Sequence, residues 1–66
     1  MNRTNDTHDE INVMGPKAKL AQLVKQFGAE VSDRFASDDI NVVVKREQCD
    51  EVTDWCNKHD VAWRLL

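Results

Sequence analysis

Apolar side chains recur along this chain with two different periods, and these periods predict which segments are strands and which are helices. Residues 10–14 alternate between polar and apolar positions, as a strand with one buried face does. In residues 16–27 the apolar positions have the i, i+3, i+4, i+7 spacing of a helix with one buried stripe: Leu20, Leu23, Val24 and Phe27. Gly28 follows at the position where a left-handed residue ends a helix.

A second strand and a third strand are predicted after this helix. Residues 29–35 are predicted as a strand with Val31 and Phe35 pointing inward, although Asp33 breaks the alternation toward its far end. Ser37–Asp39 supplies the polar side chains of a turn, which makes the flanking strands antiparallel. Residues 40–44 are β-branched and almost continuously apolar, which is typical of a central strand.

A second helix and a closing strand complete the pattern. The helix is predicted over residues 47–58, with Trp55 on its flank and an inner stripe of Cys49, Val52 and Cys56. Asn57 stands at the position that matches Gly28, so it is predicted as a left-handed cap. Residues 61–66 alternate as the closing strand, with inward positions at Val61, Trp63 and Leu65.

The tripeptide Ile-Asn-Val occurs at residues 11–13 and again at 40–42, and the core positions that follow recur at nearly the same offset. We therefore expect one strand-helix-strand unit used twice. Two such units give the β-α-β-β-α-β order of the split β-α-β, or ferredoxin-like, plan. The predicted fold class is α+β, with two helices on one face of a four-stranded sheet.

One passage of the chain resembles a known family. The motif Leu20-x-x-Leu23-Val24-x-x-Phe27-Gly28-Ala29-x-Val31, followed by the strand 40–44, resembles the first half of a BRCT domain. The resemblance covers about half of the chain and rests on a helix-to-strand passage that ends in glycine. It implies an alternative fold, a small parallel α/β sheet, with phosphopeptide or protein binding near Gly15 and Lys17.

Composition places these elements in one small domain. The 66 residues are 41% hydrophobic and 32% charged, which is a globular composition. Residues 1–9 are polar and aperiodic, so we expect a flexible tail before a single domain at 10–66. The sequence contains no apolar run that predicts a signal peptide or membrane contact, and its two cysteines fit a reducing compartment. The expected location is cytoplasmic.

No motif in the sequence predicts catalysis, a cofactor or a metal site. A Gly-rich phosphate loop and a nucleophile elbow are both absent. Cys56 and His59 share a helix face, as a catalytic thiolate pair would, but a buried thiol beside a capping histidine is the simpler interpretation. Cys49 lies seven residues before Cys56, unlike the close cysteine pairs of structural zinc sites. We therefore expect a protein that is not an enzyme.

The sheet face away from the helices is the candidate binding surface. It is expected to display an apolar centre ringed by polar groups, as association surfaces do: Asn12, Met14, Ser32, Arg34, Asn41, Val43, Ala62, Arg64 and Leu66. Trp55 is expected to be a second anchor at the margin of its helix. These residues predict a regulatory adaptor or inhibitor that binds a protein partner, or a homodimer formed through the sheet face.

Binding of nucleic acid or a phosphate ligand is the alternative function. Gly15, Pro16 and Lys17 lead into a helix N-terminus, where free N–H groups and the helix dipole attract anions, and the basic face of that helix would extend the site. The net charge of −3 argues against general nucleic-acid affinity. The outward strand positions are predicted to lack aromatic side chains, so base stacking is also disfavoured.

Overall fold

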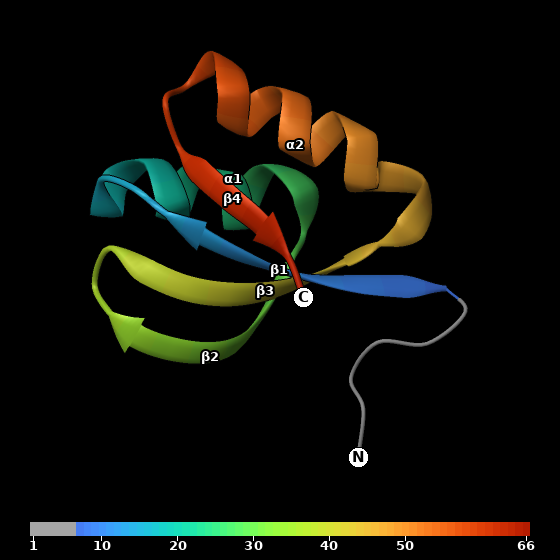
Figure 1. Ribbon diagram of the computed structural model, residues 1–66, viewed down its shortest axis with the longest axis horizontal. Helices are drawn as coiled ribbons and strands as arrows, with labels where there is room; N and C mark the ends of the chain where they lie inside the picture. Colours follow the sequence, from blue (N-terminus) through green and yellow to red (C-terminus); the bar gives the residue numbers. More distant parts are fainter. Residues whose placement is uncertain (1–6) are drawn as a thin grey trace.

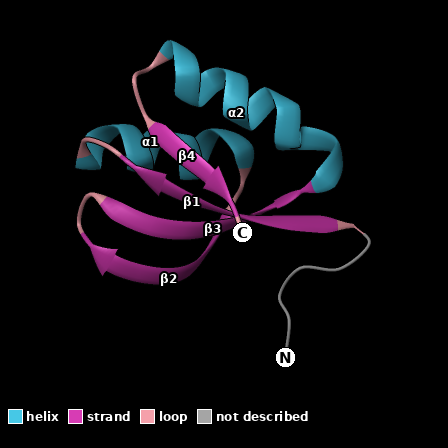
Figure 2. Ribbon diagram, in the orientation of Figure 1, coloured by secondary structure: helices cyan, strands magenta, loops and turns pink. Residues whose placement is uncertain are grey.

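The computed structural model describes residues 7–66 as one sheet with two helices (Figure 1). In chain order the elements are β1 (His8–Met14), α1 (Lys17–Phe27), β2 (Glu30–Ala36), β3 (Asp39–Lys45), the 3-10 turn η1 (Arg46–Gln48), α2 (Cys49–Lys58) and β4 (Ala62–Leu65). Figure 2 shows both helices on the same side of the sheet. The predicted α+β class, with four strands and two helices, is confirmed.

The strand order is β2-β3-β1-β4, and every neighbouring pair of strands is antiparallel. The strands that α1 connects, β1 and β2, are separated by β3, and the strands that α2 connects are separated by β1. The alternative of a parallel sheet is therefore wrong. Only two residues connect β2 to β3, and adjacent parallel strands need a crossover of a dozen or more residues, so these two strands must be antiparallel.

The strand β1 starts at His8, two residues before the predicted start at Glu10. It is longer because β3 continues to Lys45 and offers pairing positions to both His8 and Asp9. Arg46 holds this end with a guanidinium-carboxylate contact of 3.0 Å to Asp9. Of the predicted tail, residues 1–6 lie outside the described residues.

The core lies between the sheet and the two helices. Side chains from β1, β3, α1 and α2 form one buried cluster whose most enclosed members are Ile11, Val13, Leu23, Ile40, Val42, Val52 and Cys56. Gly28 ends α1 with φ 61° and ψ 32°, and its N–H donates to the carbonyl oxygen of Val24. The predicted left-handed glycine cap is confirmed.

The end of α2 differs from its prediction. Asn57 lies inside the helix, and the left-handed residue is Asp60, with φ 61°. Aspartate accepts this conformation better than most residues because its short side chain bonds locally. The Asn57 side chain instead accepts a 3.0 Å hydrogen bond from Nε1 of Trp63, which ties α2 to β4.

The strand β2 contains two β-bulges that the sequence-based alternation missed. The register shifts between Val31 and Asp33 and again between Arg34 and Ala36. Because side chains alternate with a period of two, each extra residue moves the next side chain to the opposite face. The inward prediction for Phe35 is therefore wrong, and this side chain is exposed.

The side chains of the edge strand β4 point to the predicted faces of the sheet, but those predicted to be buried are exposed. Trp63 pairs with Val13 and Leu65 pairs with Ile11, so both face the helix side. Both side chains nevertheless stay exposed, because no further strand covers this edge of the sheet. Val61, just before the strand, is buried as predicted.

Candidate functional site on the open sheet face

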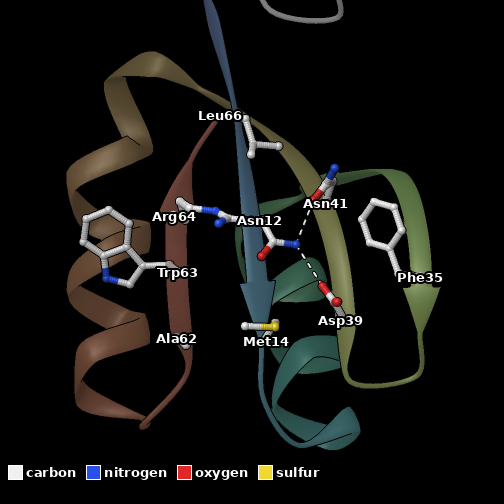
Figure 3. A pocket seen from close by; sticks show the side chains of 9 residues that line it. All are labelled: Asn12, Met14, Phe35, Asp39, Asn41, Ala62, Trp63, Arg64 and Leu66. Carbon is white, nitrogen blue, oxygen red and sulfur yellow. Dashed lines mark hydrogen bonds between the residues drawn. The ribbon is translucent and has the colours of Figure 1, made fainter.

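A shallow hollow of about 570 Å³ lies on the sheet face that the helices leave uncovered (Figure 3). We call it the open-face hollow. Its lining residues come from all four strands and from the residue after β4: Asn12, Met14, Phe35, Asp39, Asn41, Ala62, Trp63, Arg64 and Leu66. Six of these were predicted on this face from the sequence, and Phe35, Asp39 and Trp63 were missed.

Large hydrophobic side chains are concentrated around this hollow. Within residues 7–66 the exposed ones are Met14 (46%), Phe35 (63%), Trp63 (38%), Leu65 (55%) and Leu66 (59%). Met14, Phe35 and Leu66 line the hollow, whereas Trp63 reaches only its edge because its indole is directed toward α2 (Figure 3). Scattered single apolar side chains are normal on a protein surface, whereas a group on one face marks an interaction site. The gathering therefore separates this face from an ordinary solvated one.

The floor of the hollow is a polar network centred on Asn12. Its Nδ2 donates 2.9 Å hydrogen bonds to Oδ1 of Asp39 and to Oδ1 of Asn41, and it lies 3.3 Å from the carbonyl oxygen of Ile40. The two asparagines are only 7% and 8% exposed. Both asparagines lie on the face predicted for them, but they form its polar centre rather than part of a polar ring around an apolar one. Their bonding makes a rigid floor.

Two atoms of this floor have no partner within residues 7–66. Oδ1 of Asn12 and Nδ2 of Asn41 make none of the hydrogen bonds in the described chain. Neither atom is sealed from solvent, because no fully buried polar side-chain atom of the described residues lacks a partner. The floor thus offers one acceptor and one donor side by side.

Charged side chains stand at both ends of the row that contains the two asparagines. Asn12 pairs with Arg64 on β4 and with Asn41 on β3, and Asn41 pairs with Asp33 on β2. We call these four residues the central row. It runs across all four strands from a guanidinium, past two amides, to a carboxylate.

Three predicted partner-binding residues do not line the hollow: Val43, Arg34 and Trp55. Val43 is buried between its register partners Glu10 and Glu30. Arg34 pairs with Ile40 and lines a groove against α1, because the bulge before it reverses its direction. The interpretation of these two side chains as accessible contacts on the open sheet face is wrong.

Trp55 is a core residue rather than an exposed anchor. Its ring meets Phe27 edge to face at a centroid distance of 6.4 Å and stacks on His59 at 4.1 Å. These two neighbours cover both the edge and the face of the indole, so the side chain is buried. The helix flank predicted for Trp55 is covered by α1 through Phe27.

The thiols are not placed as nucleophiles. Cys56 is fully buried, and this burial raises the pKa of its thiol to about 11. Burial, followed by the carboxylates of Asp9 and Asp50, also raises the pKa of Cys49. The ring of His59 stacks on Trp55, and its Nδ1 lies 3.0 Å from Nζ of Lys19. A Cys56–His59 catalytic pair therefore has no support in the geometry. No group of three or more His, Cys, Asp or Glu side chains in residues 7–66 is arranged to hold a metal ion.

The predicted anion site at the start of α1 is partly occupied by the chain itself. The N–H of Gly15 donates to the carbonyl oxygen of Asp38 at 3.0 Å, and Pro16 has no N–H to offer. Lys17 lines a second groove, of about 270 Å³, between α1 and β2. Arg34 and Ser37 line the same groove above an apolar floor. Cationic side chains, rather than the backbone of the Gly-Pro turn, are what this region offers an anion.

Neither a protein-family model nor a curated protein sequence matches this chain. Within residues 7–66, neither helix combines the length and apolarity that crossing a membrane requires. The contacts around the open-face hollow are therefore the basis for assigning a function.

Proposed function

We propose that this protein is a non-enzymatic module that binds another protein through the open-face hollow and acts as a cytoplasmic regulatory adaptor or inhibitor. The observation that carries the proposal is the gathering of three exposed large hydrophobic residues, Met14, Phe35 and Leu66, over a rigid polar floor. Covering these side chains with a partner would remove apolar surface from water, which is the main driving force of protein association.

The strand order supports a ferredoxin-like plan as part of this proposal. Each β-α-β unit is split by a strand of the other, so both helices occupy one face. The other face then keeps its side chains free for a partner. Because this surface belongs to paired strands rather than to loops, its residues are held in fixed positions.

The chemistry of the hollow fits a protein partner. Phe35 on β2 and Arg64 on β4 line opposite sides of the hollow, and aromatic residues and arginine are enriched at protein interfaces. The free acceptor of Asn12 and the free donor of Asn41 match the N–H and C=O of a peptide group. A partner that lacked such a group would leave these largely buried atoms unpaired, so the floor adds selectivity.

The test is affinity capture from the native host with matched variants. Phe35→Glu places a charge on the open face, and we expect capture to be lost while the free energy of unfolding stays unchanged. Lys25→Glu, on the exposed surface of α1, is the control and should capture as the wild type does. Equal capture by both variants would contradict the proposal. Val43→Glu is unsuitable because it would bury a charge.

A second candidate is binding of a phosphate ligand or nucleic acid at the groove between α1 and β2. The observation that favours it is that Lys17 and Arg34 line one groove together. Titration with inorganic phosphate and with an oligonucleotide, followed through amide chemical shifts, tests it. Shifts of Lys17 and Arg34 that disappear in Lys17→Glu support this candidate, and unchanged spectra exclude it.

The same candidate fits the open sheet face less well. Base stacking was disfavoured because the outward strand positions were predicted to lack aromatic side chains. Phe35 gives that face an aromatic side chain, so this reason no longer holds. Asp33 and Asp39 lie on the face with a single arginine, however. Carboxylates repel the phosphates that supply most nucleic-acid affinity.

A further inference from the structure

We infer that the partner that fits the open-face hollow is a second copy of this chain, packed sheet on sheet about a two-fold axis. The inference rests on the proposed function, since it names the partner of the same surface. Two sheets that pack face to face keep their strand directions within about 30°. In such a two-fold interface the same patch of both copies must be complementary to itself.

The strand order selects the direction of the axis. An axis between β1 and β3, parallel to the strands, places β1 of one copy over β3 of the second and β4 over β2. An axis across the strands along the central row would instead set Arg64 against Arg64 of the second copy. Like charges in contact oppose association, so the first direction is favoured.

The central row is self-complementary about this axis. Arg64 and Asp33 end the row on β4 and β2, and the axis brings Arg64 of one copy to Asp33 of the second. Symmetry repeats this ion pair, so the interface gains two of them. Both side chains are exposed in the single chain, and neither makes an ion pair within residues 7–66.

The floor of the hollow is complementary in the same way. With β1 over β3, the free Oδ1 of Asn12 faces the free Nδ2 of Asn41 in the second copy, and the reverse pair forms by symmetry. Both hydrogen bonds use atoms that have no partner within the described chain. The second copy thus satisfies the donor and the acceptor together, which an unrelated apolar surface would not do.

The next row along the strands supplies the apolar part of the contact. It contains Ala62, Met14, Asp39 and Ala36, with Phe35 beside its β2 end. The axis places Ala62 over the segment of the second copy that carries Phe35 and Ala36, and it places Met14 over the β3 position of Asp39. A 66-residue domain buries only a modest fraction of its surface, so a dimer also supplies stability that the single chain lacks.

Sedimentation velocity of the pure protein over a concentration series tests the inference. The wild type should shift from monomer to dimer as its concentration rises. Arg64→Asp and Asp33→Arg each replace two attractive contacts with two repulsive ones, so each variant alone should dimerise roughly tenfold more weakly. An equimolar mixture of the two variants should recover wild-type association, because the substituted positions then face each other with opposite charge.

The controls separate this inference from the function on which it rests. Both substituted residues are exposed, and circular dichroism spectra should show that each variant folds as the wild type does. A wild type that stays monomeric at every concentration overturns the dimer, yet the open-face function survives if Phe35→Glu still loses capture of a host protein. A wild-type dimer whose two variants are not rescued by mixing overturns the proposed axis.

Discussion

The two faces of the sheet differ in how they treat apolar side chains, although the same repeated tripeptide forms the centre of both. Toward the helices, Ile11, Val13 and Val42 are fully enclosed. On the other face Asn12 and Asn41 bind each other, while the apolar side chains around them remain exposed. The helix-covered face is complete within one chain, and we propose that the open face is completed by a partner. Stability and binding are therefore assigned to opposite sides of one sheet.

The largest expected effect on the free energy of unfolding comes from the helix-covered face of the sheet. Leu23 is fully buried, so Leu23→Ala should lower the free energy of unfolding by about 3 to 4 kcal/mol, through lost burial and the cavity left behind. Leu65→Ala, at an exposed edge position, is the matched control and should cost less than about 1 kcal/mol. Urea denaturation measures both. Similar losses for the two variants would refute the assignment of the core.

A high-pH titration tests whether the Cys56 thiol is buried on the helix-covered face. Burial raises the pKa of Cys56 from 9.0 to about 11, so the folded protein keeps a proton that the unfolded chain releases earlier. The contribution of Cys56 is therefore fully present below pH 9 and is lost as the pH rises through about 11. We expect a loss of about 2 to 3 kcal/mol from this group. In Cys56→Ala the free energy of unfolding should fall less steeply over this range, and an unchanged pH dependence would argue against a buried thiol.

The polar floor of the open face should have an intermediate effect. Asn12→Leu removes the donor that serves Asp39 and Asn41, and leaving these oxygens unpaired should cost about 1 to 2 kcal/mol. The double variant Asn12→Leu/Asn41→Leu removes both members of the amide pair. It should recover part of this loss, since replacing both partners by apolar groups is far less costly. Thermal unfolding of the wild type, the two single variants Asn12→Leu and Asn41→Leu, and the double variant measures this coupling, and additive losses would mean that the two amides are not coupled.

The apolar rim of the hollow should have the smallest effect on stability. Phe35→Ser removes an exposed aromatic side chain and should change the free energy of unfolding by less than about 0.5 kcal/mol. Chemical denaturation at low protein concentration, where any association is minimal, measures this. A loss comparable to that of Leu23→Ala would show that Phe35 belongs to the core of the single chain.

The hydrophobic periods were sufficient to predict the elements and to place Asn12 and Asn41 on the same face of the sheet. Helices and regular strands depend on local spacing, and side chains alternate between the two faces along each strand. The α+β class and the shared face of the two asparagines therefore followed from local patterns, whereas their pairing in register did not.

The bulges of β2 were not predictable in the same way. The Ser32 hydroxyl bonds to Oε2 of Glu10, two strands away, so the local geometry of β2 depends on a contact distant in the sequence. The broken alternation at Asp33 was the only local sign of this irregularity. Phe35 and Arg34 were consequently assigned to the wrong faces, and Trp55 was misplaced because its burial depends on Phe27 from the other helix.

Hydroxyl-radical footprinting of the protein, free and in its associated state, tests most directly whether the open face is the binding surface. We predict that association protects Met14, Phe35 and Leu66, while Val24 and Phe27 on α1 keep their reactivity. Protection of the α1 residues with unchanged reactivity at Met14 and Phe35 would contradict the account.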